Sequence, residues 1–138
     1  YSLLCRLYDT DLAELSVNED VTLMGFSPLA TGYLTAKYQN GVIPERSRMS
    51  INDGMGGRAT PRILPTIQAY IEIAEKYNLN LIHMSLAWFK SRPFKAIPIV
   101  GATTKEQLEY NIKNNALVLN REIIDEIDAV HKMHPMPY

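Results

Sequence analysis

The sequence is poor in cysteine, since Cys5 is the only one among its 138 residues. A single cysteine cannot form a disulfide within the chain. This is typical of proteins in a reducing compartment, so we expect a cytoplasmic protein. Cys5 itself is expected to be a packed thiol, because the sequence offers no neighbouring base that would make it a nucleophile.

The sequence also lacks an excess of charge and lacks long hydrophobic runs. Lysine and arginine together number 14 and aspartate and glutamate 15, which gives a net charge of −1. Without a basic excess, nucleic-acid binding is disfavoured. No apolar run approaches the roughly 20 residues that span a bilayer, and no charged-then-apolar leader is present, so no membrane span is expected. The residues that are present, 46% hydrophobic and 21% charged, are typical of a globular protein.

Residues 21–38 contain a short apolar run that is followed by a proline. Residues 21–25 predict a buried strand, and Pro28, which has no backbone N–H, requires this strand to stop near Ser27. Small and hydroxyl residues follow, and then Lys37. A loop with free N–H groups and a nearby lysine suits an anion such as a phosphate, above all after a strand of an α/β protein. The alternative is an ordinary strand with a surface loop.

Residues 97–112 show the same order of features. A short apolar strand is followed by Gly101 and then by a helix that carries Gln107 and Asn111. Thr104 can cap this helix, with Gln107 as its reciprocal partner three residues on. The exposed N–H groups of the first turn and the positive end of the helix dipole predict a second anion site.

The apolar spacing along the chain predicts strands alternating with helices. Such alternation indicates a parallel sheet with helices outside it. Residues 39–61 form a long glycine-containing segment with three arginines, which we expect to be a mobile loop. The expected strands are residues 21–25 and 96–100, and the expected helices are residues 9–17, 62–77, 81–90, 104–114 and 121–132.

Taken together, several short motifs resemble the cofactor half of an aldo-keto reductase, in the branch of potassium-channel β-subunits and related bacterial reductases. The resemblance runs from the first residue nearly to the last. The motifs that carry it are Tyr1-Ser2-Leu3-Leu4 with Arg6, Phe26-Ser27-Pro28-Leu29-Ala30-Thr31-Gly32 with Lys37-Tyr38, Ser47-Arg48, and Gly101-Ala102-Thr103-Thr104 with Glu106-Gln107-Leu108 and Asn111.

The resemblance implies an α/β fold, the C-terminal portion, about half, of a (β/α)8 TIM barrel. A whole barrel needs about 250 residues, so residues 1–138 are expected to be a single partial domain that binds the cofactor. The sequence begins without methionine, and Tyr1 to Leu4 resemble the end of a strand. We therefore expect a C-terminal fragment whose partner is the missing N-terminal half of the barrel, with oligomer formation as a further possibility.

The resemblance also implies NADP(H) as the cofactor, bound first through the chain start and the first loop. In the family a tyrosine in the position of Tyr1 stacks on the nicotinamide, although a frayed terminal residue is the alternative here. Phe26 lines the substrate side, or is an ordinary core aromatic. Lys37 reaches a phosphate, or is a solvated surface lysine. The pyrophosphate is held by the backbone around Ser27, Leu29 and Thr31, with Pro28 and Ala30 between them.

The adenosine end is expected to lie against Arg48 and the second loop. Arg48 matches an arginine that meets the adenosine phosphate, with Arg46 as its rival. Gly101, Thr103, Gln107 and Asn111 match positions around the adenine and the 2′-phosphate. The family's other branch has lysine and arginine in place of Gly101 and Gln107, and the channel-subunit branch has glutamate in place of Tyr110, so the strength of the NADP preference stays open.

The resemblance implies an oxidoreductase that reduces a small carbonyl substrate, an aldehyde or a ketone, to an alcohol. The family's catalytic Asp, Tyr, Lys and His lie in the first half of its barrel, so no catalytic residue is assigned here. His131 and His134 lack a third ligand, and no metal site is expected. The alternatives are a cofactor-bound regulatory or interaction subunit of the same fold and a non-catalytic half-barrel that folds only with another chain.

Overall fold

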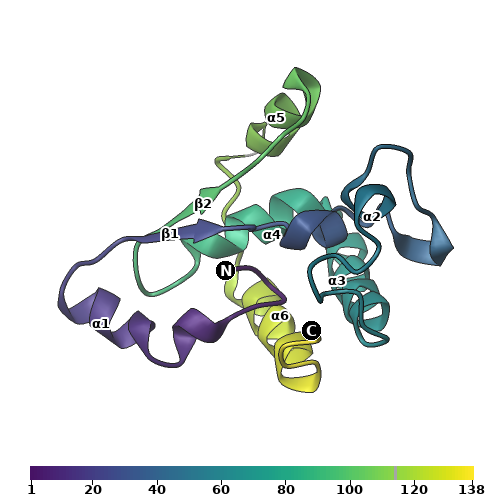
Figure 1. Cartoon of the computed structure of the whole chain (residues 1–138). Helices are drawn as coiled ribbons and strands as arrows, with labels where there is room; N and C mark the ends of the chain where they lie inside the picture. The colour runs from purple at the N-terminus through teal and green to yellow at the C-terminus, as the bar shows by residue number, and fades with distance from the viewer. Residues whose placement is uncertain (114) are drawn as a thin grey trace.

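The centre of the molecule is a parallel pair of strands. The computed structural model describes residues 1–113 and 115–138. Strands β1 (Leu23–Phe26) and β2 (Ala96–Ile99) pair in parallel, so that Leu23 lies opposite Ala96 and Phe26 opposite Ile99 (Figure 1). The predicted parallel pairing is therefore confirmed, because helices rather than a hairpin turn connect the two strands.

The helices that follow the strands agree closely with the expected ranges. The long helices are α3 (Ile63–Lys76), α4 (Leu81–Lys90) and α6 (Arg121–Met133), and α5 (Lys105–Ile112) follows β2. Asn78 adopts the left-handed conformation (φ 51°) that stops α3, and Asn80 and Asn120 cap the helices that follow them. Asn114, the expected last residue of α5, lies outside the described residues. None of the described helices is both long enough and apolar enough to cross a membrane.

The start of the chain differs from the expected helix and strand bounds. Residues 7–9 form a separate 3-10 turn (η1, Leu7–Asp9), and α1 (Leu12–Asn18) begins only after it. The backbone N–H of Val21 donates to Ser16 O at 3.1 Å, so Val21 closes the end of α1 and cannot begin the strand. Tyr1 to Leu4 are not the end of a strand in this structure, where Ser2 forms only an isolated bridge with Cys5.

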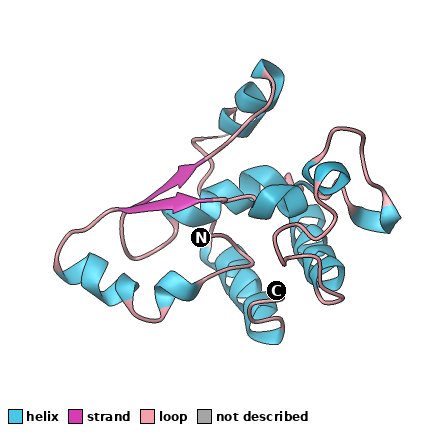
Figure 2. Ribbon diagram, in the orientation of Figure 1, coloured by secondary structure: helices cyan, strands magenta, loops and turns pink. Residues whose placement is uncertain are grey.

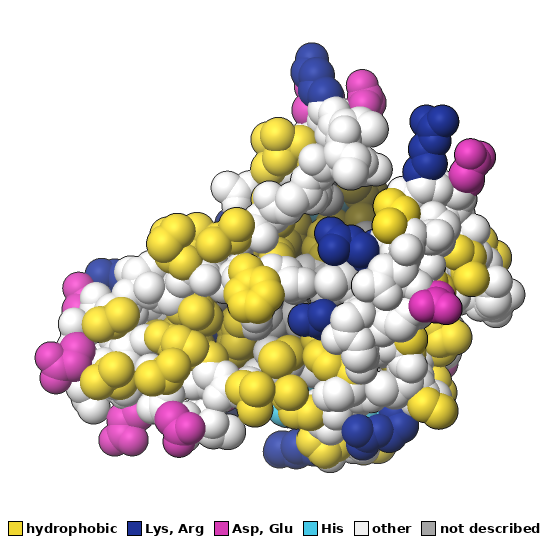
Figure 3. Space-filling model, in the orientation of Figure 1, with side chains coloured by type: hydrophobic (Ala, Val, Ile, Leu, Met, Phe, Trp, Pro, Cys, Tyr) yellow, Lys and Arg dark blue, Asp and Glu magenta, His cyan; other side chains and the backbone are white. Residues whose placement is uncertain are grey.

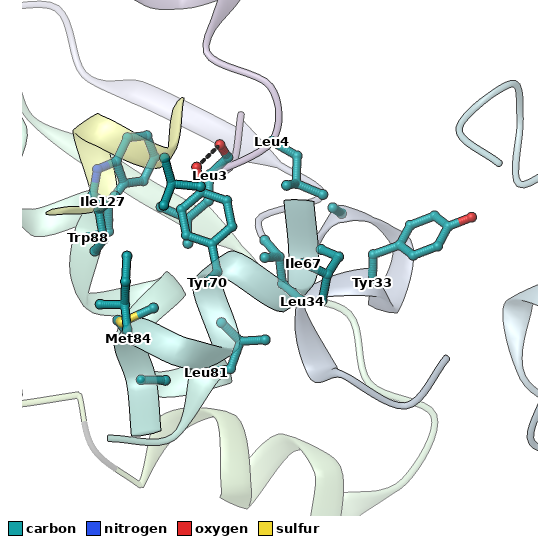
Figure 4. Packing of buried hydrophobic residues seen from close by; sticks show 14 of the residues in the cluster. Leu3, Leu4, Tyr33, Leu34, Ile67, Tyr70, Leu81, Met84, Trp88 and Ile127 are labelled. Atoms are coloured by element: carbon teal, nitrogen blue, oxygen red, sulfur yellow. Dashed lines mark hydrogen bonds between the residues drawn. The ribbon is translucent and has the colours of Figure 1, made fainter. Parts of the chain in front are cut away.

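The hydrophobic core lies between α3, α4, α6 and the chain start. Trp88, Tyr70 and Ile127 are completely buried there, each on a different helix, and Figure 4 shows them beside Leu3. The Tyr70 hydroxyl donates a hydrogen bond to Leu3 O at 3.1 Å, which attaches the chain start to α3. The predicted apolar faces of these helices are therefore the faces that pack.

Residues 1–113 and 115–138 cover only one face of the strand pair. A Cβ on Gly25 would lie 2.6 Å from Phe89 Cε1, so this face packs so closely on α4 that only glycine fits there. The opposite face carries Met24, Phe26, Ile97 and Ile99, which are 66%, 68%, 54% and 46% exposed. Apolar side chains also gather over the strands in Figure 3. The strands are therefore buried on one face only, and the open face is the inward face that half of a barrel is expected to leave uncovered.

The segment between β1 and α3 is less irregular than expected. It contains the short turns η2 (Ala30–Thr35), η3 (Gln39–Gly41) and α2 (Arg48–Ile51), joined by loops (Figure 2). Its far end is held by the non-helical tail of the chain, because Thr60 Oγ1 donates to Pro137 O and Arg62 Nη2 donates to Met136 O at 3.0 Å. Mobility of residues 39–61 stays a prediction.

The uncovered strand face predicts that the 138-residue chain is not a stable monomer, because an exposed apolar patch normally finds a partner. Sedimentation velocity or light scattering should show association or aggregation. The double variant Met24→Gln/Ile97→Gln should raise the monomer fraction. Ile51→Gln, which removes an isoleucine that is 77% exposed on α2, should leave it unchanged. A monodisperse wild-type monomer with a cooperative melt would contradict this prediction.

The hydrogen bond from Tyr70 to Leu3 O predicts a stability loss. Tyr70→Phe should lower the free energy of unfolding by about 1–2 kcal/mol, because it leaves a buried carbonyl unpaired. Urea denaturation at one fixed protein concentration, followed by the emission of the single Trp88, measures this.

Burial of the same hydroxyl should make stability depend on pH in the alkaline range. Burial raises the pKa of Tyr70 to about 12 from its ordinary value of 10.0. The stabilisation is therefore present below pH 10 and is lost as the pH rises towards 12. If Tyr70→Phe and wild type have the same free energy of unfolding at pH 7, the hydrogen bond from Tyr70 to Leu3 O contributes nothing to stability.

Candidate functional site

The parallel pairing brings the two predicted anion loops to one edge of the strand pair. Phe26 and Ile99 are opposite each other at the carboxyl ends of β1 and β2, so both loops start side by side. The amino group of Tyr1 donates to Phe26 O at 3.0 Å, which places the chain start at the same edge. Ligands of open α/β sheets bind at this kind of edge.

The loop after β1 is tightly wound. Ser27, Ala30, Thr31 and Gly32 all have positive φ (57°, 49°, 57° and 99°). Ala30 N–H donates to Ser27 O at 2.9 Å, Thr31 N–H to Ser27 Oγ at 3.2 Å and Gly32 N–H to Leu29 O at 2.9 Å. The expectation of a loop with free N–H groups is therefore wrong for Ala30, Thr31 and Gly32, because the left-handed turns direct these N–H groups back into the loop. Positive φ at non-glycine residues is uncommon, and residues with such strained conformations cluster at functional sites.

Lys37 lies over this loop. A Cβ on Gly32 would be 3.2 Å from Lys37 Nζ, and the φ of 99° also disfavours a side chain at this position. The ammonium group lies 5.1 Å from the centroid of the Tyr38 ring and the side chain remains exposed. The positive charge is thus held close to the loop backbone, where an anion would be attracted to it.

Arg48 lies on the segment that packs next to Lys37. Tyr38 Oη accepts a hydrogen bond of 3.4 Å from Met49 N–H, which attaches the start of α2 to the Lys37–Tyr38 pair. Ser47 is buried and caps α2 by accepting from Ser50 N–H, so Arg48 is the first residue of the helix and is exposed. The rival Arg46 is also exposed, 4.0 Å from Glu45.

In the second loop, Thr104 caps α5 as predicted, by accepting from Gln107 N–H at 3.2 Å. The predicted reciprocal bond is displaced by one residue, because Gln107 Oε1 accepts from the backbone N–H (3.0 Å) and the hydroxyl (2.9 Å) of Thr103. The pKa of Glu106 is lowered by a hydrogen bond with its own backbone and by one with the Thr104 hydroxyl. A carboxylate that stays ionised at this turn opposes a second phosphate there.

The helix α5 is attached to the body by two residues that sequence reasoning did not assign to the site. His83 Nε2 is 2.7 Å from Tyr110 O, and the two rings stack at 4.8 Å. None of residues 105–112 is buried, and α5 stands away from the other helices in Figure 1. Nothing in the sequence pairs His83 with Tyr110, since the contact joins two different helices.

The ring of Tyr1 already has partners inside the molecule. It stacks on Trp88 at 5.0 Å and meets Phe89 edge-on at 5.4 Å, and its hydroxyl donates to Asp9 at 2.5 Å. Burial, followed by this hydrogen bond, raises the pKa of the Tyr1 hydroxyl. A frayed terminus therefore does not describe Tyr1, and its stacking on a nicotinamide stays a prediction.

The other residues expected to bind the cofactor differ in their exposure at this edge of the strand pair. Pro28 and Ala30 are buried, so only their backbone could meet a ligand. Phe26 belongs to the exposed strand face, which excludes the reading as an ordinary core aromatic. A Cβ on Gly101 would meet open space, so the site has room for a larger side chain there, and Asn111 is half-buried on α5. Among the described residues no group of His, Cys, Asp and Glu could hold a metal ion.

Comparisons with known proteins identify the family of this chain. Residues 1–132 match the family model described as aldo/keto reductase family. The chain is 36% identical over 137 residues to Protein tas of Escherichia coli (strain K12), covering 99% of this chain and 40% of that protein. It is 34% identical to the L-glyceraldehyde 3-phosphate reductase of Escherichia coli O157:H7 and 30% identical to a probable voltage-gated potassium channel subunit beta of Arabidopsis thaliana. These matches cover 93% and 92% of this chain, and 39% and 40% of those proteins.

A solved structure shows the same fold. The crystal structure of a thermostable aldo-keto reductase with the inhibitor epalrestat superposes with a TM-score of 0.62 and 22% identity, over 94% of this chain and 37% of that one. The chain thus spans about 40% of the length of the curated relatives it matches. The family match over nearly the whole sequence shows that this chain belongs to the aldo/keto reductase family.

Proposed function

We propose that this chain is the NADP(H)-binding part of an oxidoreductase that reduces aldehydes or ketones to alcohols, and that the catalytic tetrad lies outside it. The observation that supports this most is the convergence of the two loops at one edge, with Lys37 over the first loop. We assign the chain to the C-terminal half of the barrel and to the cytoplasm.

In this proposal the cofactor supplies the hydride and the chain binds and orients it. Lys37 and Arg48 offer positive charge to the phosphates, and arginine can engage two phosphate oxygens at once. The loop from Ser27 to Gly32 gives a rigid floor, because the N–H groups of Ala30, Thr31 and Gly32 are bonded internally. Thr103 and Gln107 are already bonded to each other and would have to exchange this bond for the ligand.

A regulatory subunit of the same fold is the second candidate. One relative bears the name of a potassium channel subunit beta, while another is named as a reductase. The exposed strand face and the proposed binding residues are compatible with both candidates. Turnover of an aldehyde with NADPH by the protein that contains this chain separates them, because a regulatory subunit would bind the cofactor with little oxidation of it.

The first prediction of this proposal concerns cofactor choice. The protein should bind NADPH more tightly than NADH, and Arg48→Ala should remove about 1.5–3 kcal/mol of NADPH binding, the contribution of a hydrogen bond to a charged group. Fluorescence titration measures both affinities. Arg46→Ala, two residues away and equally exposed, is the matched control and should change little. Equal wild-type affinities for NADPH and NADH would contradict the assignment.

A further prediction concerns residues 41–60. They should exchange amide hydrogens quickly without cofactor and be protected when NADPH binds, because the exposed Arg48 lies within them and few of their side chains are buried. The neighbourhood of the buried Ser47 and Met55 should be the slowest part of the segment. Hydrogen exchange with and without NADPH tests this, with α3 as the internal control. Unchanged protection across the segment would exclude a closing clamp.

A further inference from the structure

A cavity of about 450 Å³ lies on the side of the molecule formed by α6, the segment after α4 and Arg6. It is lined by four cationic side chains, namely Arg6, Arg92, Arg121 and Lys132, against two carboxylates, and His131 completes the wall. No residue assigned above to the cofactor lines this cavity. Its charge therefore needs an explanation of its own.

Three nitrogen atoms of the cavity residues are buried without a hydrogen-bond partner in the described part of the chain: Arg6 Nε, Arg92 Nε and His131 Nδ1. The side chain of Arg6 is only 5% exposed. A buried donor that lacks a partner is unfavourable, and nearly all buried polar groups in proteins have one. Two of these atoms, Arg6 Nε and Arg92 Nε, are always donors, and their position beside one cavity indicates that an acceptor belongs there.

The carboxylates near the cavity do not satisfy these donors. Asp128 accepts from Arg6 Nη1 at 2.6 Å, and Ile127 O accepts from Arg6 Nη2 at 3.3 Å, so both terminal nitrogens are used and Nε remains. Asp9 likewise accepts from Arg92 Nη2 at 3.1 Å.

The outer cations of the cavity leave positive charge unbalanced. Asp125 pairs with Arg121 at 2.9 Å across the exposed surface of α6. Lys132 forms no ion pair with any carboxylate of residues 1–113 or 115–138. The cavity therefore keeps positive charge after its internal pairs are formed.

The two arginines are held in place by the same aromatic ring. The guanidinium carbons of Arg6 and Arg92 lie 4.5 Å and 4.9 Å from the ring of Trp88, which is completely buried. Stacking on an aromatic face fixes the planar fork of an arginine, so less conformational freedom is lost when it binds an anion. Burial, and after it the positive charge of Arg6, lowers the pKa of His131, which is consistent with a positive potential in the cavity.

We propose that this cavity binds a small oxyanion, a phosphate or a carboxylate, between Arg6, Arg92 and His131. The oxyanion accepts from the two Nε–H groups, and Lys132 adds charge at the rim. Guanidinium groups match the oxygens of both anion classes. This site is independent of the cofactor site proposed above.

Trp88 is the only tryptophan of the chain, and it reports directly on both arginines. Titration of the protein that contains this chain with inorganic phosphate, and separately with malonate, should give a saturable change in Trp88 emission that chloride at the same ionic strength does not give. A response to phosphate alone or malonate alone identifies the anion class. No saturable response to either, or the same response to chloride, overturns the proposal.

Variants of the cavity residues locate the site. Their affinities are also measured by calorimetry, because Arg92→Gln changes the surroundings of Trp88 and therefore its emission. Arg92→Gln should weaken binding about ten-fold, the effect of losing one charge-assisted hydrogen bond. The exposed rim variant Lys132→Gln should weaken it to a smaller extent without disturbing the fold. Unchanged affinity in both variants overturns the proposal.

Two matched controls remove single positive charges elsewhere. Lys95→Gln changes an exposed lysine that pairs with Asp20 at 2.7 Å outside the cavity and should leave the affinity unchanged. Lys37→Gln tests the cofactor loop. If phosphate binding is lost in Lys37→Gln and kept in Arg92→Gln, the phosphate occupies the cofactor loop, and this proposal fails while the proposed function stands.

Discussion

The parallel pairing of β1 with β2 determines where the loops of the candidate site begin. It aligns Phe26 with Ile99, so the turn after each strand starts at the same edge although many residues separate the two in the sequence. The pairing is possible because Gly25 lets β1 approach Phe89 on α4, where a Cβ would be only 2.6 Å away from the ring. A side chain at this position would push the strand away from the helix, and the alignment of both loops would change with it.

Around this pair the molecule is built asymmetrically. The helices α3, α4 and α6 bury one side of the structure in a continuous core, while the side with Met24, Phe26, Ile97 and Ile99 stays open. The alternation of side chains along a strand explains both facts, because neighbouring residues point to opposite faces of the sheet. In a closed barrel the second face is packed as well.

Sequence patterns predicted the helices and strands well where local rules dominate. The range 81–90 for α4 and the start of α6 at Arg121 were predicted correctly, since Asn80 and Asn120 are strong helix caps and Pro93 excludes a longer α4. The start of β1 was predicted too early, because the N–H of Val21 is used by α1.

The contacts that were not predicted, in the candidate site and in the cavity beside α6, join residues that are distant in the sequence. No local rule pairs His83 with Tyr110 or brings Arg6 and Arg92 onto Trp88. The N–H groups after Ser27 are bonded within the loop because Ala30 and Thr31 adopt left-handed conformations. Alanine and threonine rarely adopt this conformation, so their presence does not predict it. Sequence motifs could therefore indicate which residues lie near the site but not how those residues are bonded.

The attachment of α5 has a consequence for the energetics of any ligand it meets. An isolated helix of eight residues is unstable in water. With no buried residue of its own, α5 depends on its cap at Thr104 and on the stacked rings of His83 and Tyr110. It should therefore open and close as a separate cooperative unit, at a lower free energy than the core. A ligand held by Thr103 and Gln107 then binds only the closed fraction of molecules, and its observed affinity is lower than its intrinsic affinity by that fraction.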